Sequence, residues 1–238
     1  MEKFRPIALL LATLAFGAAP FLTAPFEGYP PETFPVVIER PSIQPAGYAF
    51  SIWSVIYLWL LVHAVYGIWK RRDDPDWVVT GWPLTASLAV GSLWLYIAPQ
   101  APVIATVSII VMAGLALVAF LRADTFADRW TLAAPLAIYS GWLSAASAVS
   151  LGIVLAGYGL LTDTGAALSM LVVVLAVAVT VQLRQPRMPV YGLTVLWALA
   201  GVAVANWGVN VTVFLGALAG MVVMLATLFL TLPKLRHA

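Results

Sequence analysis

Long apolar runs separated by short polar or proline-containing segments dominate the 238-residue chain. A bilayer core about 30 Å thick needs roughly 20 residues of apolar helix, so each run of that length predicts one transmembrane helix. The first six runs predict helices over about residues 6–24, 48–69, 78–98, 102–121, 130–157 and 165–183. The last run, 189–232, is about twice the length of one crossing and is interrupted by Asn206-Trp207-Gly208-Val209-Asn210, so it predicts two helices joined at a polar turn. The pattern therefore predicts an all-α polytopic membrane protein with about eight transmembrane helices.

The positions of the basic residues give a second, independent indication of this topology. Lysine and arginine gather in cytoplasmic loops and are costly inside a membrane helix. If eight helices alternate, one side of the membrane receives Lys3, Arg5, Lys70, Arg71, Arg72, Arg122, Arg129, Arg184, Arg187, Lys234 and Arg236. Only Arg40 falls on the other side. This predicts an integral membrane protein with both termini cytoplasmic; without the split of the last run, the C-terminus moves to the far side. We expect the membrane to be a bacterial inner membrane.

Composition excludes several classes of protein. With 63% hydrophobic and 9% charged residues and a mean hydropathy of +0.99, the chain is not an ordinary soluble domain. It contains no cysteine, which excludes disulfides and thiolate metal sites. Its net charge of +2 does not indicate a nucleic-acid partner, because in a membrane protein the distribution of basic residues among the loops matters more than their sum.

The stretch from Arg40 to Ala64, RPSIQPAGYAFSIWSVIYLWLLVHA, combines a proline-punctuated loop with an aromatic helix. Pro41 and Pro45 each fix a backbone φ angle and remove an amide donor, so they favour a stiff, extended approach to the helix. Trp53 and Tyr57 are four residues apart and share one helix face. A stiff lid beside an aromatic face is suited to a binding pocket.

Tryptophans fall into two groups along the predicted helices. Those near helix ends suit the headgroup level of a membrane, namely Trp69, Trp77, Trp82, Trp130 and Trp207. Trp53, Trp94 and Trp142 lie further inside their helices, where they either pack in the core or line an apolar cavity. Such a cavity would suit a flat hydrophobic ligand, with a few indole and phenol groups to orient it.

His63 is the one ionisable side chain predicted deep inside a helix. Two interpretations stay open: it ligates a haem iron or relays a proton, or it is neutral and hydrogen-bonds a neighbouring helix. The chain has no HExxH, P-loop or GxSxG motif and no pair of intramembrane carboxylates, which argues against a hydrolytic or phosphoryl-transfer enzyme. An enzyme acting on a bound pigment or isoprenoid is the least favoured reading.

Small residues form a further pattern. Ser140, Ser144 and Ser147 fall on one side of the fifth helix, and Gly216 and Gly220 form a GxxxG in the last. This spacing lets helix backbones approach closely, either within the monomer or across a homodimer.

The order Arg40-Pro41-Ser42, Pro45, Phe50, Trp53, Tyr57 resembles the loop and second helix of the TspO/MBR family of tryptophan-rich sensory or translocator proteins. The family's fifth-helix pattern is similar to Tyr139, Trp142 and Ala146, and its third-helix Asn-x-x-Trp is similar to the segment ending in Trp94. Gly91 and Ser150 stand where the family has asparagine. The resemblance covers roughly residues 1–157 and implies a five-helix bundle with a proline-rich loop at 25–47, followed over 158–238 by three additional helices.

The resemblance also implies a function. A member of this family would bind a tetrapyrrole such as protoporphyrin or haem, or a sterol- or isoprenoid-like lipid, in sensing, trafficking or regulation. The implied ligand contacts are Pro41, Pro45, Phe50, Trp53, Tyr57, Trp94, Tyr139, Trp142 and Ala146. Membrane lipids and a lipophilic small molecule are then the expected partners. The alternative is a structural or assembly subunit that docks onto a membrane complex, or onto a second copy, through its last three helices.

Overall fold

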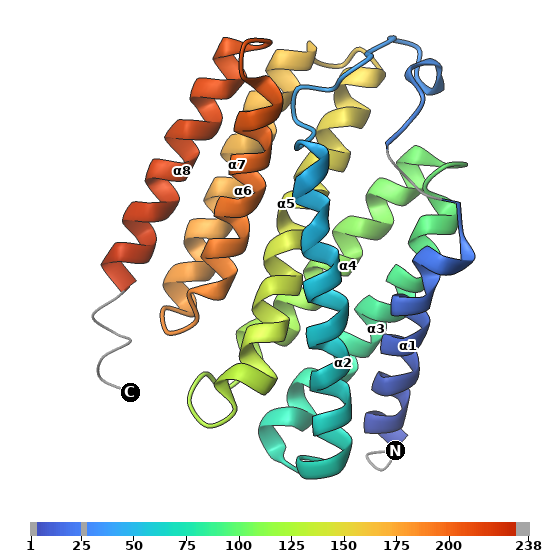
Figure 1. The fold of residues 1–238 in the computed structure, drawn as a ribbon, viewed down its shortest axis with the longest axis vertical. Helices are drawn as coiled ribbons and strands as arrows, with labels where there is room; N and C mark the ends of the chain where they lie inside the picture. Colours follow the sequence, from blue (N-terminus) through green and yellow to red (C-terminus); the bar gives the residue numbers. More distant parts are fainter. Residues whose placement is uncertain (1–3, 25–27, 232–238) are drawn as a thin grey trace. The chain divides into compact units, whose positions relative to one another are not determined.

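The structure, a computed structural model, describes residues 4–24 and 28–231, and every regular element within these ranges is helical (Figure 1). The α-helices in order are α1 (Arg5–Leu22), α2 (Ile52–Lys70), α3 (Pro75–Ile97), α4 (Pro102–Arg122), α5 (Ala134–Gly157), α6 (Asp163–Arg184), α7 (Val190–Asn206) and α8 (Val211–Thr231). Seven helical segments of the described chain are long and apolar enough to cross a membrane, and α7 is a shorter apolar helix of 17 residues. The predicted all-α polytopic membrane fold is confirmed.

Helix boundaries follow local chemistry. Pro75 and Pro102 begin α3 and α4, where the missing N–H costs nothing. The side chain of Thr162 caps α6 by accepting from the Gly165 amide at 3.1 Å. The polar turn at 206–210 separates α7 from α8 as predicted, and Asn210 Oδ1 accepts from the Val213 amide at 3.2 Å. The start of α2 differs from the prediction, because a 3₁₀ turn, Gly47–Ser51, precedes it.

The chain divides into two compact units. Unit 1 contains residues up to 25 and 52–143, which hold α1 to α4 and the first part of α5. Unit 2 contains 26–51 and residues from 144 onward, which hold the proline-rich loop, the rest of α5 and α6 to α8. Helix α5 is thus shared, with Leu143 in unit 1 and Ser144 in unit 2. A boundary at residue 157 between a family-like part and additional helices stays a prediction.

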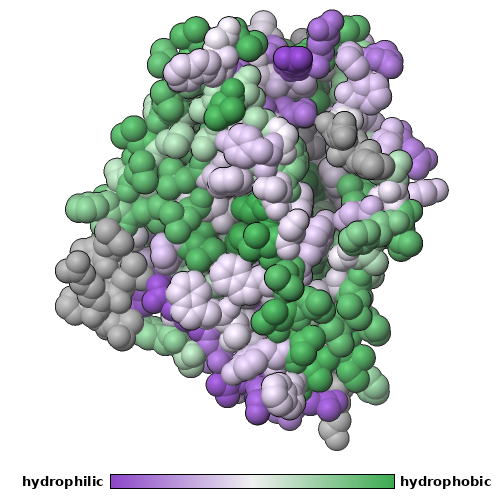
Figure 2. Space-filling model, in the orientation of Figure 1, coloured by the Kyte–Doolittle hydropathy of each residue, from purple (hydrophilic) through white to green (hydrophobic). Residues whose placement is uncertain are grey.

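Large apolar side chains cover the outer surfaces of the helices. On α8, for example, Val222, Phe229 and Leu230 are each at least 66% exposed, and the surface over this helix is hydrophobic in Figure 2. Exposed apolar surface on this scale is typical of a protein that contacts lipid rather than water. Membrane lipids are therefore its immediate surroundings.

The GxxxG of α8 packs inside unit 2. A Cβ atom added at Gly216 would lie 2.9 Å from Leu168 Cδ2, and one added at Gly220 would lie 3.0 Å from Leu175 Cδ1. Both leucines belong to α6, so the two glycines let α6 and α8 approach closely. Of the two interpretations of this motif, the structure shows packing within the monomer.

A π-helical turn, Arg129–Ala133, leads into α5 ahead of Pro135. In an α-helix the amide of residue 135 would donate to Thr131 O, four residues earlier, and in a π-helix it would donate to Trp130 O, five residues earlier. Proline has no N–H, so neither oxygen receives this hydrogen bond. Two side chains of α2 take the place of this N–H: His63 Nδ1 lies 2.8 Å from Thr131 O, and Trp59 Nε1 donates to Trp130 O at 2.8 Å. Because a carbonyl oxygen only accepts, Nδ1 of His63 carries the proton. The structure thus shows the hydrogen bond of one interpretation of His63, and iron ligation stays a prediction.

A polar cluster joins the α2–α3 turn to the segment before α5 in unit 1. Arg71 Nε donates to Asp128 Oδ2 at 2.7 Å, and Trp77 Nε1 donates to the same oxygen at 2.8 Å. Partial burial acts to raise the pKa of Asp128, but the hydrogen bonds from Arg71 and Trp77 and the arginine charge outweigh it and hold that pKa below its ordinary value.

This lowered pKa predicts an acid-dependent contribution to stability. A carboxyl group whose pKa is lower in the folded than in the unfolded protein stabilises the fold above its unfolded pKa of about 3.9, and this stabilisation is lost as the pH falls through the folded value. We expect Asp128→Asn to lower the unfolding temperature at pH 7, with a deficit that shrinks below about pH 4. Thermal unfolding in detergent from pH 7 to pH 3 measures this, with exposed Asp73→Asn as the control. A deficit that stays constant to pH 3 would contradict the prediction.

Candidate functional site

Four of the predicted site residues come together in unit 1. Trp53 stacks on Tyr57, with ring centroids 5.4 Å apart and planes 18° from parallel. Trp142 meets Trp53 edge-to-face at 6.2 Å. Tyr139 joins them through Phe16 of α1, whose ring lies 5.8 Å from Tyr139 and 5.1 Å from Tyr57. We call these five residues the aromatic site.

Hydrogen bonding fixes the buried end of the aromatic site. Tyr139 is 0% exposed, and its hydroxyl lies 2.9 Å from Ser87 Oγ on α3. Ser87 Oγ donates its single proton to Met112 O of α4 at 2.9 Å, so the Tyr139 hydroxyl is the donor to Ser87. One polar chain thus joins α5, α3 and α4 behind the rings and fixes the orientation of Tyr139.

The remaining predicted ligand contacts lie elsewhere in the chain. In unit 1, Trp94 of α3 donates its indole N–H to Ala105 O of α4 at 2.9 Å. In unit 2, Phe50 lies in the 3₁₀ turn before α2 and is 41% exposed, and Ala146 is half-buried on α5. Pro41 and Pro45 line two separate hollows of unit 2. Sequence reasoning missed Phe16 and Ser87, because nothing distinguishes an apolar or a small residue within a helix as part of a site.

The proline-rich loop is bonded to α6, α7 and the α7–α8 turn. Ser42 donates its amide to Asp163 Oδ1 at 2.9 Å and its hydroxyl to Asp163 Oδ2. Asn206 Nδ2 donates to Ser42 O at 2.7 Å, and Asn210 Nδ2 donates to Ser42 Oγ at 3.1 Å. Further along the loop, the Ala46 amide donates to Gly201 O of α7 at 3.0 Å. We call Ser42, Asp163, Asn206 and Asn210 the loop clamp.

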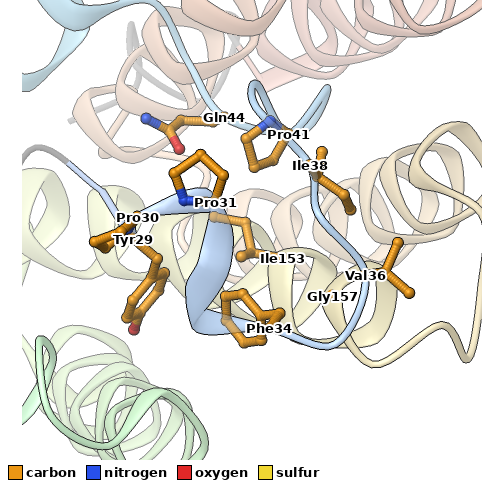
Figure 3. Close-up of a pocket in the computed structure, with 10 residues that line it drawn as sticks. All are labelled: Tyr29, Pro30, Pro31, Phe34, Val36, Ile38, Pro41, Gln44, Ile153 and Gly157. Carbon is orange, nitrogen blue, oxygen red and sulfur yellow. The ribbon is translucent and has the colours of Figure 1, made fainter.

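Figure 3 shows a hollow where the loop crosses the end of α5. The hollow is small, with a cavity volume of about 10 Å³. Ile153 and Gly157 of α5 face loop residues that include Phe34, Pro41 and Gln44. Gly157 is required here, because a Cβ atom would lie 2.5 Å from Phe34 Cγ. Burial raises the pKa of Tyr29 to about 12, against the opposing effect of the Ser150 hydroxyl, so this phenol is neutral at physiological pH.

A second hollow of unit 2, with a cavity volume of about 20 Å³, is entirely aliphatic. Pro45 covers it, and its walls come from α5, α6 and α7, among them Ala148, Val174 and Ala198. Pro45 rests on Gly201, where a Cβ atom would lie 2.9 Å from Pro45 Cβ. No polar side chain lines this hollow, so the described structure offers nothing there to orient a ligand.

Comparison with known proteins gives one match. A family model described as "TSPO-like protein" matches residues 37–230, which is well over half of the chain. No curated protein and no solved structure matches the chain significantly. The matched range starts in the proline-rich loop and includes α2 to α7 and most of α8. The chain therefore belongs to the TSPO-like protein family.

Proposed function

We propose that this membrane protein binds a flat lipophilic ligand, a tetrapyrrole or a sterol- or isoprenoid-like lipid, at the aromatic site. The role we assign to it is sensing, trafficking or regulation in a bacterial inner membrane. The observation that carries the proposal is the convergence of Trp53, Tyr57, Tyr139 and Trp142 on one place in unit 1. Membership in the TSPO-like family supports ligand binding in general.

The chemistry of the aromatic site suits such a ligand. Aromatic rings bury large areas and prefer offset-stacked or edge-to-face contacts, both of which a planar macrocycle can make. Burial contributes about 25 cal/mol per Å² of apolar area, before the cost of ordering is subtracted. Trp53 and Tyr57 are only partly buried, so their rings offer the accessible part of the site.

Five further ligand contacts are proposed from the sequence alone. They are Trp94, Pro41, Pro45, Phe50 and Ala146. Iron ligation by His63 also stays a prediction. With Nδ1 bonded to Thr131, the ring nitrogen available for a metal is Nε2, which is buried and has no hydrogen-bond partner among the described residues.

Titration with protoporphyrin IX and with haem tests the proposal, with the absorbance of the porphyrin as the signal. Because an aromatic pair contributes about 0.5–1.5 kcal/mol beyond area burial, we expect Trp53→Phe and Trp142→Phe each to weaken saturable binding about two- to tenfold. Trp69→Phe is the matched control, because Trp69 is 74% exposed and lies at the end of α2.

Two outcomes would change the proposal. Absence of saturable binding by folded wild-type protein and by every variant would refute ligand binding at this site. Equal affinity for haem and for metal-free protoporphyrin would exclude His63 as an iron ligand, because an axial bond adds affinity only for the metal complex.

A further inference from the structure

Phe16 occupies the centre of the aromatic site. Its ring makes edge-to-face contacts with Trp53, Tyr57 and Tyr139, at centroid distances of 5.7, 5.1 and 5.8 Å and interplanar angles of 64–70°. Phe16 is 5% exposed and lies on the buried face of α1, together with Leu9, Thr13 and Ala19. This is the contact geometry that a planar aromatic guest would adopt against the same three rings.

Gly91 on α3 provides the space for this ring. A Cβ atom at position 91 would lie 2.7 Å from Phe16 Cε2 and 2.8 Å from Met112 Cε, closer than real Cβ atoms approach their neighbours. Asparagine, which the TspO/MBR pattern has at this position, could not coexist with Phe16 as it now lies. The departure from the family pattern at Gly91 and the inward position of Phe16 are therefore sterically coupled.

We propose that the Phe16 ring is an internal substitute for the ligand, so that a planar aromatic guest binds only when Phe16 swings out of the aromatic site. This inference rests on the proposed function and adds to it the regulation of the site by α1. The guest class is a molecule with a flat aromatic edge, such as one pyrrole side of a tetrapyrrole. Closure by Phe16 reduces the apparent affinity by the fraction of protein that is open.

The opposite arrangement, in which Phe16 is one wall of the site, gives the opposite result. Truncating a wall removes contact area and weakens binding, whereas truncating a substitute removes a competitor and strengthens it. The direction of the affinity change therefore separates the two arrangements.

The test compares wild type with Phe16→Ala, Gly91→Ala and the control Phe21→Ala, which removes an 88% exposed phenylalanine from the same helix. Protoporphyrin IX is the probe, and its absorbance the signal. We expect Phe16→Ala to bind about tenfold more tightly or better than wild type. Gly91→Ala pushes the ring outward and should also bind more tightly, while Phe21→Ala should match wild type. Phe16→Leu provides a second test if the alanine variant does not fold.

The outcomes distinguish this inference from the proposed function. Weaker binding by Phe16→Ala or Phe16→Leu, beside saturable binding by wild type, would overturn the substitute role and leave the proposed function standing. Saturable binding by Phe16→Ala with little or none by wild type would support both. No binding by any of the folded proteins would overturn the proposed function, and this inference with it.

Discussion

Replacing Asn206 by aspartate should destabilise the protein by about 3–5 kcal/mol, although the two side chains have nearly the same shape. Asn206 is 2% exposed, and its Nδ2 donates to Ser42 O at 2.7 Å and to Val202 O at 2.8 Å. In the aspartate variant a carboxylate oxygen replaces Nδ2 and faces the carbonyl oxygens of Ser42 and Val202, so both hydrogen bonds are lost. The carboxylate would also be a buried charge without a partner at this position. Thermal unfolding in detergent measures the loss of stability.

The loop should also become accessible to protease. Glu32 and Glu39 are exposed residues of the loop, on the chain before Ser42. We expect a glutamate-specific protease to cut there faster in Asn206→Asp than in wild type, since Ser42 O has lost its donor.

Asn210→Asp is the matched control. The Nδ2 group of Asn210 faces two hydroxyl groups, Ser42 Oγ at 3.1 Å and Thr164 Oγ1 at 2.8 Å, and the Thr164 hydroxyl can turn to donate. Aspartate is also as good as asparagine as the N-cap of α8. We expect this variant to lose less than half as much stability as Asn206→Asp. Equal losses at both positions would show that added charge, rather than the loss of the hydrogen bond from Asn206 to Ser42 O, accounts for the effect.

His63→Leu should destabilise the protein by about 1–3 kcal/mol. The effect should depend on Pro135, because proline has no N–H that could replace His63 as the donor to Thr131 O. Leucine fills similar space but leaves Thr131 O without the donor that His63 provides at 2.8 Å. In Pro135→Ala, residue 135 regains an N–H that can reach Thr131 O as in an ordinary α-helix. We therefore expect His63→Leu to cost clearly less in the Pro135→Ala background. Unfolding of the two single variants and the double variant measures this coupling.

The design separates hydrogen bonding from packing. His63 also stacks on Trp77, with ring centroids 4.6 Å apart, and that contact is lost whichever residue stands at position 135. If the substitution costs the same in both backgrounds, the stacking contact explains the whole effect and the role assigned to Thr131 O is wrong.

Helix number and position were predictable, because membrane helices are long apolar runs bounded by proline, glycine and charge. The turn at 206–210 was identified because the 44-residue apolar run is about twice the length of one crossing and is interrupted there by a polar segment. The 3₁₀ turn at Gly47–Ser51 and the π turn at Arg129–Ala133 were not predicted. Pro135 was a visible signal for the second, but the donors that replace its N–H come from α2, about 70 residues earlier in the chain.

The aromatic site was predictable in part. Trp53 and Tyr57 share a helix face by spacing, and the family pattern pointed to Tyr139 and Trp142. Phe16 was not found, because its ring packs where Gly91 leaves space, 75 positions along the chain, and no local pattern shows that the two positions meet. The loop clamp was missed for the same reason: Ser42 and Asn206 are 164 positions apart, and only the folded chain brings them together.

The loop clamp determines when, during synthesis of the chain, the proline-rich loop becomes fixed in place. Ser42 is synthesised 164 residues before Asn206, and at 5–20 residues per second that interval is about 8–33 s. During this time the loop has left the ribosome without one of its anchors. Until α7 and α8 have been synthesised, the proline-rich loop lacks the hydrogen bond from Asn206 and is open to binding by the cellular factors that insert membrane proteins.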